Sequence, residues 1–157
     1  MNRFEVTEAK PWFCGAIIRR LRSEHKAAVA WLGLNSHREI RDKFDASSFA
    51  RAYFIDGHLS GLGGVMGSAL STSGFVWLAL TEEAAAHPYA VVREAKRQMA
   101  EIMQTKHVLR TTLIPEDRPA LRFALRIGFE IEHSTPIPAG KGHVLSVIFA
   151  RRGLIAA

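Results

Sequence analysis

Apolar and polar residues follow three patterns along the chain, and each pattern predicts a different kind of element. Residues 4–9 alternate between apolar and polar, which predicts a short first strand. Residues 75–80 form an almost continuous apolar run, typical of a strand that is buried on both faces. From residue 88 to residue 106, apolar residues return at steps of three and four, which predicts an amphipathic helix.

Two helices are expected near the start of the chain. Residues 12–32 are helical in composition, with Pro11 suited to the helix start and Gly33 to its end. Ser36 followed by Glu39 matches a capping box, which predicts a second, short helix to about residue 44.

Strands are expected on both sides of the central apolar run. Residues 49–56 hold aromatic and β-favouring residues and lead into Asp56-Gly57, a hairpin-turn dipeptide. Residues 59–70 contain four glycines, which is typical of a strand with bulges or close backbone approaches. After the long helix, residues 108–114 predict another strand.

The last part of the chain carries clear helix-end signals. Asp117 is a suitable N-cap, Pro119 lies in the first turn, and Gly128 suits the position after the last turn. Two strands follow, near residues 129–135 and 143–149. The order β-α-α-β-β-β-α-β-α-β-β predicts one α/β domain over residues 1–157, with helices on both faces of its sheet.

The segment around the last helix resembles a known family. Residues 119–130 read as a helix that ends in a Gly128-Phe129 turn into a strand, which resembles the last conserved segment of the GNAT acetyltransferase superfamily. The order of elements is similar to the GNAT fold across nearly the whole chain. The resemblance implies a mixed sheet of about six or seven strands, with the fourth and fifth strands splayed into a V-shaped cleft. It also implies acetyl-CoA as the cofactor and acyl transfer to a small-molecule amine.

The loop that should hold the cofactor departs from the family pattern. In the family, a Q/R-x-x-G-x-G/A loop after the fourth strand binds the CoA pyrophosphate through backbone N–H groups. Residues 81–88 of this chain contain no glycine. Glu82 and Glu83 bring negative charge, and Pro88 removes one N–H donor. These residues argue against the usual mode of pyrophosphate binding.

A second departure concerns acid catalysis. Many family members carry a tyrosine four residues before the glycine of the Gly-Phe turn, where it protonates the leaving thiolate. This chain has Ala124 at that position, and an alanine has no proton to donate.

A narrower resemblance rests on fewer residues. Trp77, the pair His87-Pro88 and the Gly128-Phe129 segment resemble a group of bacteriophage-encoded GNAT-like proteins, related to the small internal virion protein of T7-like phages. This resemblance implies a GNAT scaffold kept for infection or particle assembly. The implied partner is a phage particle component, met in the host cytoplasm or the virion.

The GNAT resemblance also places cofactor-binding residues. Backbone groups of Leu78 and Leu80 would hold the pantetheine, and Arg122 would meet a phosphate. His87 and Tyr89 lie near the expected cofactor loop. Their side chains, like that of Arg122, would contact the cofactor or fill its cleft. Arg122 also belongs to a basic stripe on the last helix, for which a solvent-facing role is the alternative.

Two residues are candidates for catalysis. Glu82, or a water molecule, would act as the general base, and Thr111 would orient the substrate amine. The alternatives are helix capping or surface exposure for Glu82, and plain strand propensity for Thr111 and its neighbour Thr112.

Composition excludes several classes of protein. Apolar residues make up 48% and charged residues 23% of the chain, the balance of a globular domain. One cysteine, Cys14, excludes an internal disulfide framework and fits a reducing cytosol. No apolar run reaches about 18 residues, so no membrane span is expected. A cytoplasmic location follows as the expectation.

The formal charge of +6 suits an anionic partner or a plainly solvated surface. No RNA- or DNA-binding motif accompanies the basic residues, so a nucleic-acid role is not expected. The seven histidines are scattered, without an H-E-x-x-H motif or a Cys/His cluster, which argues against a metal site.

Two functions from different classes remain after these arguments. The first is a non-catalytic GNAT-like protein of phage or prophage origin that binds a protein partner through a degenerate site. The second is an active CoA-dependent N-acetyltransferase with an atypical cofactor loop. The acceptor and the oligomeric state are left open.

Overall fold

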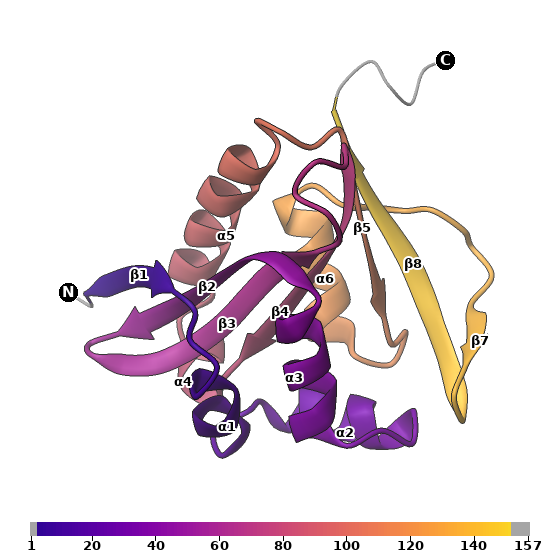
Figure 1. The fold of residues 1–157 in the computed structure, drawn as a ribbon. Helices are drawn as coiled ribbons and strands as arrows, with labels where there is room; N and C mark the ends of the chain where they lie inside the picture. Colours follow the sequence, from indigo (N-terminus) through magenta and orange to yellow (C-terminus); the bar gives the residue numbers. More distant parts are fainter. Residues whose placement is uncertain (1–2, 152–157) are drawn as a thin grey trace.

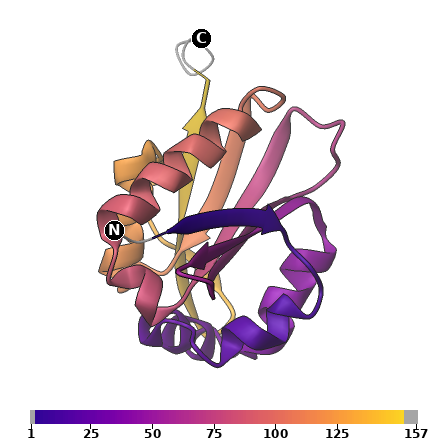
Figure 2. The same cartoon turned by 90° about the vertical axis from the view of Figure 1, so that its left-hand side faces the viewer.

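The computed structural model describes residues 3–151 and shows one twisted sheet with helices on both faces (Figure 1, Figure 2). The sheet has eight strands in the order β1-β2-β3-β4-β5-β8-β6, and β7 pairs with β8. The strands are β1 (Phe4–Glu8), β2 (Ser47–Ile55), β3 (His58–Met66), β4 (Ser73–Leu80), β5 (Val108–Leu113), β6 (Glu130–Ile131), β7 (Ile137–Ala139) and β8 (Gly142–Ala150). The helices are α1 (Phe13–Ile18), α2 (Ser23–Trp31), α3 (Ser36–Asp45), α4 (Glu82–Ala85), α5 (Pro88–Ile102) and α6 (Arg118–Ile127).

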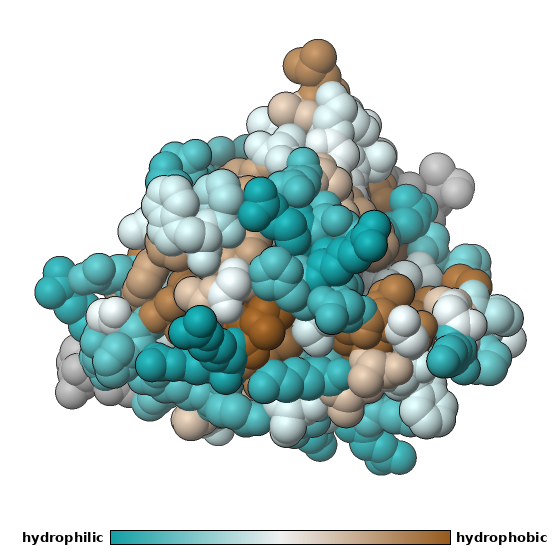
Figure 3. All heavy atoms as spheres, turned by 60° about the horizontal axis from the view of Figure 1, so that its bottom comes forward, coloured by the Kyte–Doolittle hydropathy of each residue, from teal (hydrophilic) through white to brown (hydrophobic). Residues whose placement is uncertain are grey.

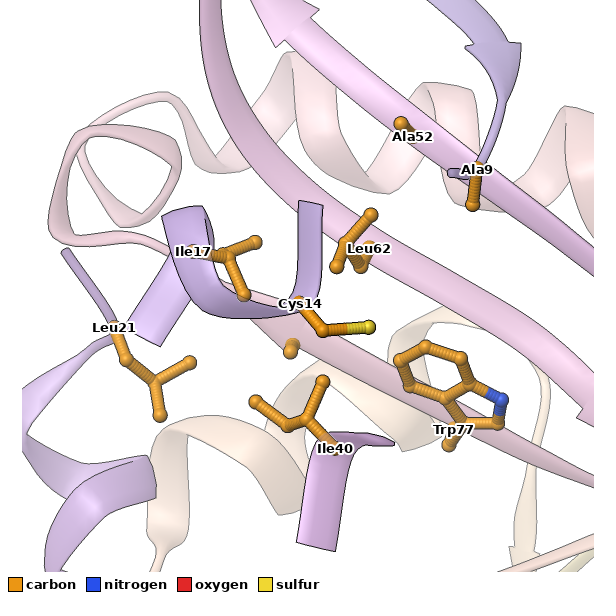
Figure 4. Close-up of a cluster of buried hydrophobic side chains, with 9 residues drawn as sticks. Ala9, Cys14, Ile17, Leu21, Ile40, Ala52, Leu62 and Trp77 are labelled. Atoms are coloured by element: carbon orange, nitrogen blue, oxygen red, sulfur yellow. The ribbon is translucent and has the colours of Figure 1, made fainter. Parts of the chain in front are cut away.

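The predicted α/β class and the helices on both faces are confirmed by two separate cores. On one face, α1 and α3 pack on the first strands through residues that include Cys14, Ile40 and Trp77 (Figure 4). On the other face, α5 and α6 pack through Met99 and Ala124. We call these the α1/α3 face and the α5/α6 face.

Strands β1 to β4 form an antiparallel meander, as the sequence predicts. The turn between β2 and β3 is formed by Asp56 and Gly57, both with positive φ (50° and 82°). This conformation is that of the two-residue hairpin turn that the dipeptide predicts.

Strands β4 and β5 run parallel and then separate, which confirms the expected splay. Only Ser73, Gly74 and Phe75 pair with β5, opposite Val108, Leu109 and Arg110. Beyond these pairs the two strands continue to Leu80 and Leu113 without hydrogen bonds between them. The sheet therefore has an opening between the carboxyl ends of its two central strands.

The start and end of α6 follow the predicted signals. The side chain of Asp117 accepts a hydrogen bond from the Ala120 N–H, at 3.3 Å. Gly128 ends the helix with φ 114°, a left-handed conformation that favours glycine. A Cβ at Gly128 would also lie 2.6 Å from the ring of Phe149, so the position requires glycine for a second reason.

Several elements differ from the prediction. The helix expected over residues 12–32 is two helices, because Leu21 forms a β-bridge with Thr81 and the Arg22 N–H donates to the Leu80 carbonyl at 2.9 Å. Asn35, not Ser36, caps α3 by accepting from the Arg38 N–H.

Four further differences concern β6, β7, α4 and α5. The strand expected over residues 129–135 has two residues, and β7 and α4 form where turns or a loop were expected. Helix α5 ends at Ile102, before the expected residue 106.

A candidate site in the splay between β4 and β5

A cavity of about 540 Å³ occupies the opening between β4 and β5. Its lining includes residues of α5 and α6 from one face of the sheet and of α2 and α3 from the other. Figure 3 shows the end of the molecule at the bottom of Figure 1, where apolar surface lies between polar side chains. The cavity therefore passes through the sheet, and its volume is that of a small-molecule site.

The half of the cavity on the α5/α6 face is mainly apolar. Val91, Ala95 and Met99 of α5 and Phe123 of α6 are among its lining residues. Gln98 adds a polar group within this apolar wall and is only 4% exposed. Its Nε2 donates to Glu94 Oε1 at 2.9 Å, while its Oε1 has no hydrogen-bond partner among the described residues.

Tyr53 of β2 lines the same half of the cavity. Burial, and next the negative charge of Glu94, raise its pKa to about 12. The phenol is therefore neutral at physiological pH and offers one hydrogen-bond donor and an acceptor.

The half of the cavity on the α1/α3 face is polar and holds a buried carboxylate. Glu39 Oε1 pairs with the Lys43 ammonium one turn along α3, and Glu39 Oε2 lies 3.8 Å from His25 Nε2. Burial acts to raise the pKa of Glu39, but the neighbouring His25 and Lys43 together lower it below its ordinary value. Glu39 is thus ionised at neutral pH.

An ion pair joins the two sides of the opening. Arg22 Nη2 donates to Asp117 Oδ2 at 2.9 Å, and the two side chains are only 12% and 9% exposed. Since the Arg22 N–H also binds the end of β4 at Leu80, this residue connects β4 with the start of α6. Both members of the pair line the cavity.

The charge of the lining is opposite to that of the chain. The lining contains two cationic side chains and four carboxylates, so its formal charge is −2 with histidine neutral. The cations are Arg22 and Lys43, and the carboxylates are Glu24, Glu39, Glu82 and Asp117. The whole chain carries +6. The cavity is therefore electrostatically unfavourable for anions inside a basic protein.

Most backbone N–H groups in the turn from β4 to α5 are already hydrogen-bonded within the protein. Thr81 caps α4, because its Oγ1 accepts from the Ala84 N–H at 3.2 Å. Five N–H groups of this turn donate to other protein groups: those of Glu82, Ala84, Ala85, Ala86 and His87. Pro88, the next residue, has no N–H group.

Four of the residues proposed from sequence lie at the cavity: Leu78, Leu80, Glu82 and Thr111. Thr111 lies on the same side of β5 as Leu109, which packs in the core of the α5/α6 face. Glu82 Oε1 accepts from the Ser23 N–H at 2.8 Å and so caps the first turn of α2. The catalytic roles of Glu82 and Thr111 stay predictions.

The backbone of Leu78 and Leu80 points toward the opening. The Thr81 N–H donates to the Ser60 carbonyl, and bonded and non-bonded pairs alternate along an antiparallel ladder. Leu78 and Leu80 therefore occupy the positions that direct their N–H and C=O groups away from β3. The Leu80 carbonyl already accepts from Arg22, so Leu78 offers the more available groups for a ligand.

The other three candidates lie outside the cavity lining formed by the described residues. His87 precedes α5 and is half-buried, Tyr89 is 82% exposed, and Arg122 is exposed on α6. Their side chains do not fill the opening, and their roles toward a cofactor stay predictions.

Sequence reasoning missed Arg22, Glu39 and Gln98. Arg22 belongs to a basic run that reads as exposed, and Glu39 reads as a capping residue. Gln98 has no signal in the sequence except its place on the apolar side of an amphipathic helix, next to Met99.

Residues 3–151 show neither a metal-binding cluster nor a helix suited to crossing a membrane. No group of three or more His, Cys, Asp or Glu side chains in this range is placed to hold a metal ion. Over the same residues, no helix combines the length and the apolar character that crossing a membrane requires.

The sequence matches no protein-family model and no curated protein sequence. Solved structures are similar in fold, among them the aminoglycoside acetyltransferase AAC(6')-Ib in complex with coenzyme A, with a TM-score of 0.68, 11% identity and 99% of both chains covered. A GNAT-family acetyltransferase from Bacillus anthracis has a TM-score of 0.63 and 13% identity, with 94% of this chain and 95% of that chain covered. One from Streptococcus pneumoniae has a TM-score of 0.59 and 15% identity, with 94% and 99% covered. The chain has the GNAT acyltransferase fold.

Proposed function

We propose that this protein is a GNAT-fold protein with a degenerate acetyl-CoA site, and that it acts by binding a partner. The observation that carries the proposal is the β4–α5 turn, where five N–H groups are bonded within the protein. A pyrophosphate at a helix N-terminus needs backbone N–H groups that point at the ligand. Freeing the N–H groups of Ala84, Ala85 and Ala86 would require α4 to unfold.

Electrostatics supports the same proposal. Coenzyme A carries several phosphate groups, and the lining of the cavity has a formal charge of −2. Glu83 adds another carboxylate beside the turn, where it lies 3.6 Å from His58 Nδ1. Like charges close together in a partly buried site repel strongly enough to affect binding.

The proposal extends to origin and partner. Trp77, His87-Pro88 and Gly128-Phe129 resemble phage-encoded GNAT-like proteins, which supports a phage or prophage origin. The partner is then a component of the phage particle, met in the host cytoplasm or in the virion. The genes that flank the coding sequence test this origin, and a neighbourhood of host metabolic genes alone would contradict it.

A second candidate function is supported by the open cavity. An N-acetyltransferase needs the thioester and the amine to meet, and this cavity is lined by residues from both faces of the sheet. The side chains of His87, Tyr89 and Arg122 do not fill it. In this case the Leu78 backbone would hold the pantetheine, and Glu82 or a water would act as the base.

Titration calorimetry and thermal unfolding with acetyl-CoA separate the two functions. We expect no heat of binding and no shift in the unfolding midpoint at several millimolar ligand. A dissociation constant below about 100 μM would instead stabilise the fold by about 1.4 kcal/mol at millimolar acetyl-CoA. Such a shift, together with release of free CoA in the presence of a panel of amines, would establish the second function.

A further inference from the structure

Three arginines on α6 have no partner within residues 3–151. Arg118, Arg122 and Arg126 are exposed and follow one another at steps of four residues, so they form one row along the helix. None of their guanidinium groups forms a hydrogen bond or an ion pair with the described residues. Leu125 is 44% exposed and borders the row, three residues after Arg122. We call these four residues the α6 stripe.

The α6 stripe faces away from the cavity. At about 3.6 residues per turn, its members lie on the opposite side of the helix from the residues that line the cavity or pack in the core. Those residues are Pro119, Ala120, Phe123, Ala124 and Ile127. The α6 stripe is therefore a surface separate from the candidate site.

The neighbouring helix extends the positive charge of this surface. Helix α5 packs next to α6 on the same face of the sheet (Figure 1, Figure 2). The two helices together contain six arginine or lysine residues and two glutamates, a formal charge of +4. Both glutamates are already paired, Glu94 with Arg97 and Glu101 with Arg51 of β2. Neither carboxylate is therefore available to the α6 stripe.

The residue types and their spacing indicate what the α6 stripe binds. Guanidinium groups bind carboxylates through two parallel hydrogen bonds, which a lysine ammonium cannot do. Four residues of an α-helix span about 6 Å, so carboxylates at four-residue intervals on a second helix have the same spacing as the three arginines. Proteins that bind single-stranded nucleic acid stack the bases on aromatic side chains, and the α6 stripe carries the aliphatic Leu125 instead. These features favour an acidic protein helix.

We propose that the α6 stripe binds a protein partner that presents an acidic α-helix, with carboxylates at four-residue intervals and an apolar side chain against Leu125. The positive charge of α5 and α6 attracts this helix before contact. The inference rests on the proposal that the protein acts by binding a partner. It does not depend on whether acetyl-CoA binds, because the α6 stripe lies outside the cavity lining.

A synthetic peptide tests the proposal. The probe is an alanine-rich helical peptide of about 18 residues, with three glutamates at four-residue intervals and a leucine beside the middle one. We expect it to shift the backbone N–H signals of the α6 stripe in NMR spectra. Its affinity should fall as the salt concentration rises from about 50 to about 300 mM, because exposed ion pairs are screened. The control peptide has glutamine in place of each glutamate and should not bind. Equal binding of both peptides, or no shift at the α6 stripe, overturns the proposal.

A triple variant tests the arginines themselves. We expect Arg118→Gln/Arg122→Gln/Arg126→Gln to bind the acidic peptide at least about tenfold more weakly, which is the combined contribution of three exposed ion pairs. Its urea unfolding midpoint should stay near that of the wild type, because the three side chains are exposed and make no ion pair in the fold.

The matched control variant removes the same charge elsewhere on the surface. It replaces three exposed cations near α1 and α2 with glutamine: Arg19, Arg20 and Lys26. We expect this variant to bind the acidic peptide like the wild type. An equal loss of affinity in both variants would show that net charge alone attracts the peptide, and would overturn the proposal.

Two competitors distinguish an acidic helix from a phosphate ligand. They are coenzyme A and a single-stranded DNA of about 20 nucleotides. We expect neither to displace the acidic peptide at the concentration at which the peptide itself half-saturates the protein. Displacement by either would make the α6 stripe a phosphate site and overturn the inference. Calorimetry with acetyl-CoA tests the degenerate cofactor site independently, so the two proposals can fail separately.

Discussion

At the scale of single residues, Glu39 is a largely buried carboxylate in the lining of the cavity. It stays ionised because Lys43 and His25 offset the effect of burial on its pKa. Its folded-state pKa lies below the ordinary glutamate value of 4.5. The stabilisation that it provides is therefore present above about pH 4.5 and is lost as the pH falls through the lower, folded-state value.

The variant Glu39→Gln tests this contribution. At neutral pH it should lower the free energy of unfolding by about 1 to 3 kcal/mol, because Lys43 loses its charged partner. Below the folded-state pKa of Glu39, where the wild-type carboxyl is also neutral, the difference should disappear. Urea unfolding at a series of pH values measures the loss of stability at neutral pH and its disappearance at low pH, with exposed Glu5→Gln as the control. A difference that does not depend on pH would show that the carboxylate charge is not the cause.

At the scale of elements, the residue pair Arg22–Asp117 joins three of them. It connects the start of α2, the end of β4 and the start of α6 across the opening of the sheet. Asp117 does two things here, since one oxygen pairs with Arg22 and the other caps α6. Loss of Arg22 alone would leave a buried carboxylate without its cation.

A double-mutant cycle measures this connection. We expect Arg22→Met to cost about 3 to 5 kcal/mol of stability, the range found when one partner of a buried ion pair is removed. Asp117→Asn keeps an oxygen that can cap α6 and removes the charge. The double variant should be more stable than the sum of the single effects predicts, by at least about 1 kcal/mol. Additive effects would show that the pair does not couple, and exposed Arg20→Met should stay within about 0.5 kcal/mol of wild type.

Elements with local signals could be predicted from sequence, and those that depend on a distant neighbour could not. The cap of α6 at Asp117, its end at Gly128 and the Asp56-Gly57 hairpin are encoded within a few residues. The break between α1 and α2 is not, because it exists to pair with Leu80 and Thr81, about 60 residues away along the chain.

The candidate site shows the same division. Family resemblance placed Leu78, Leu80, Glu82 and Thr111 at the opening, since strand order fixes which strand ends meet there. The resemblance could not identify Gln98, because the feature that distinguishes it, a side-chain oxygen without a hydrogen bond, is visible only in the folded structure. Pattern alone cannot separate a buried glutamine with an open acceptor from one on the border of a helix face.

At the scale of the whole molecule, our proposal of a degenerate acetyl-CoA site rests on two properties. One is charge, because the residues that line the cavity have a net formal charge of −2, although the whole chain carries +6. The other is geometry, because five N–H groups of the β4–α5 turn are hydrogen-bonded within the protein. These causes are separable, since the carboxylates of Glu82 and Glu83 can be neutralised while α4 keeps its cap at Thr81.

The double variant Glu82→Gln/Glu83→Gln separates charge from geometry. We expect it to bind acetyl-CoA no better than about 1 mM in calorimetry, because five N–H groups of its turn stay bonded within the protein and are not directed at a pyrophosphate. A glutamine at position 82 also retains an oxygen that can accept from the Ser23 N–H, so α2 should keep its start. The matched control, Glu5→Gln/Glu8→Gln on β1, makes the same change in total charge outside the cavity. Binding below about 100 μM in the first variant and not in the second would mean that the carboxylates of Glu82 and Glu83 alone keep the cofactor out.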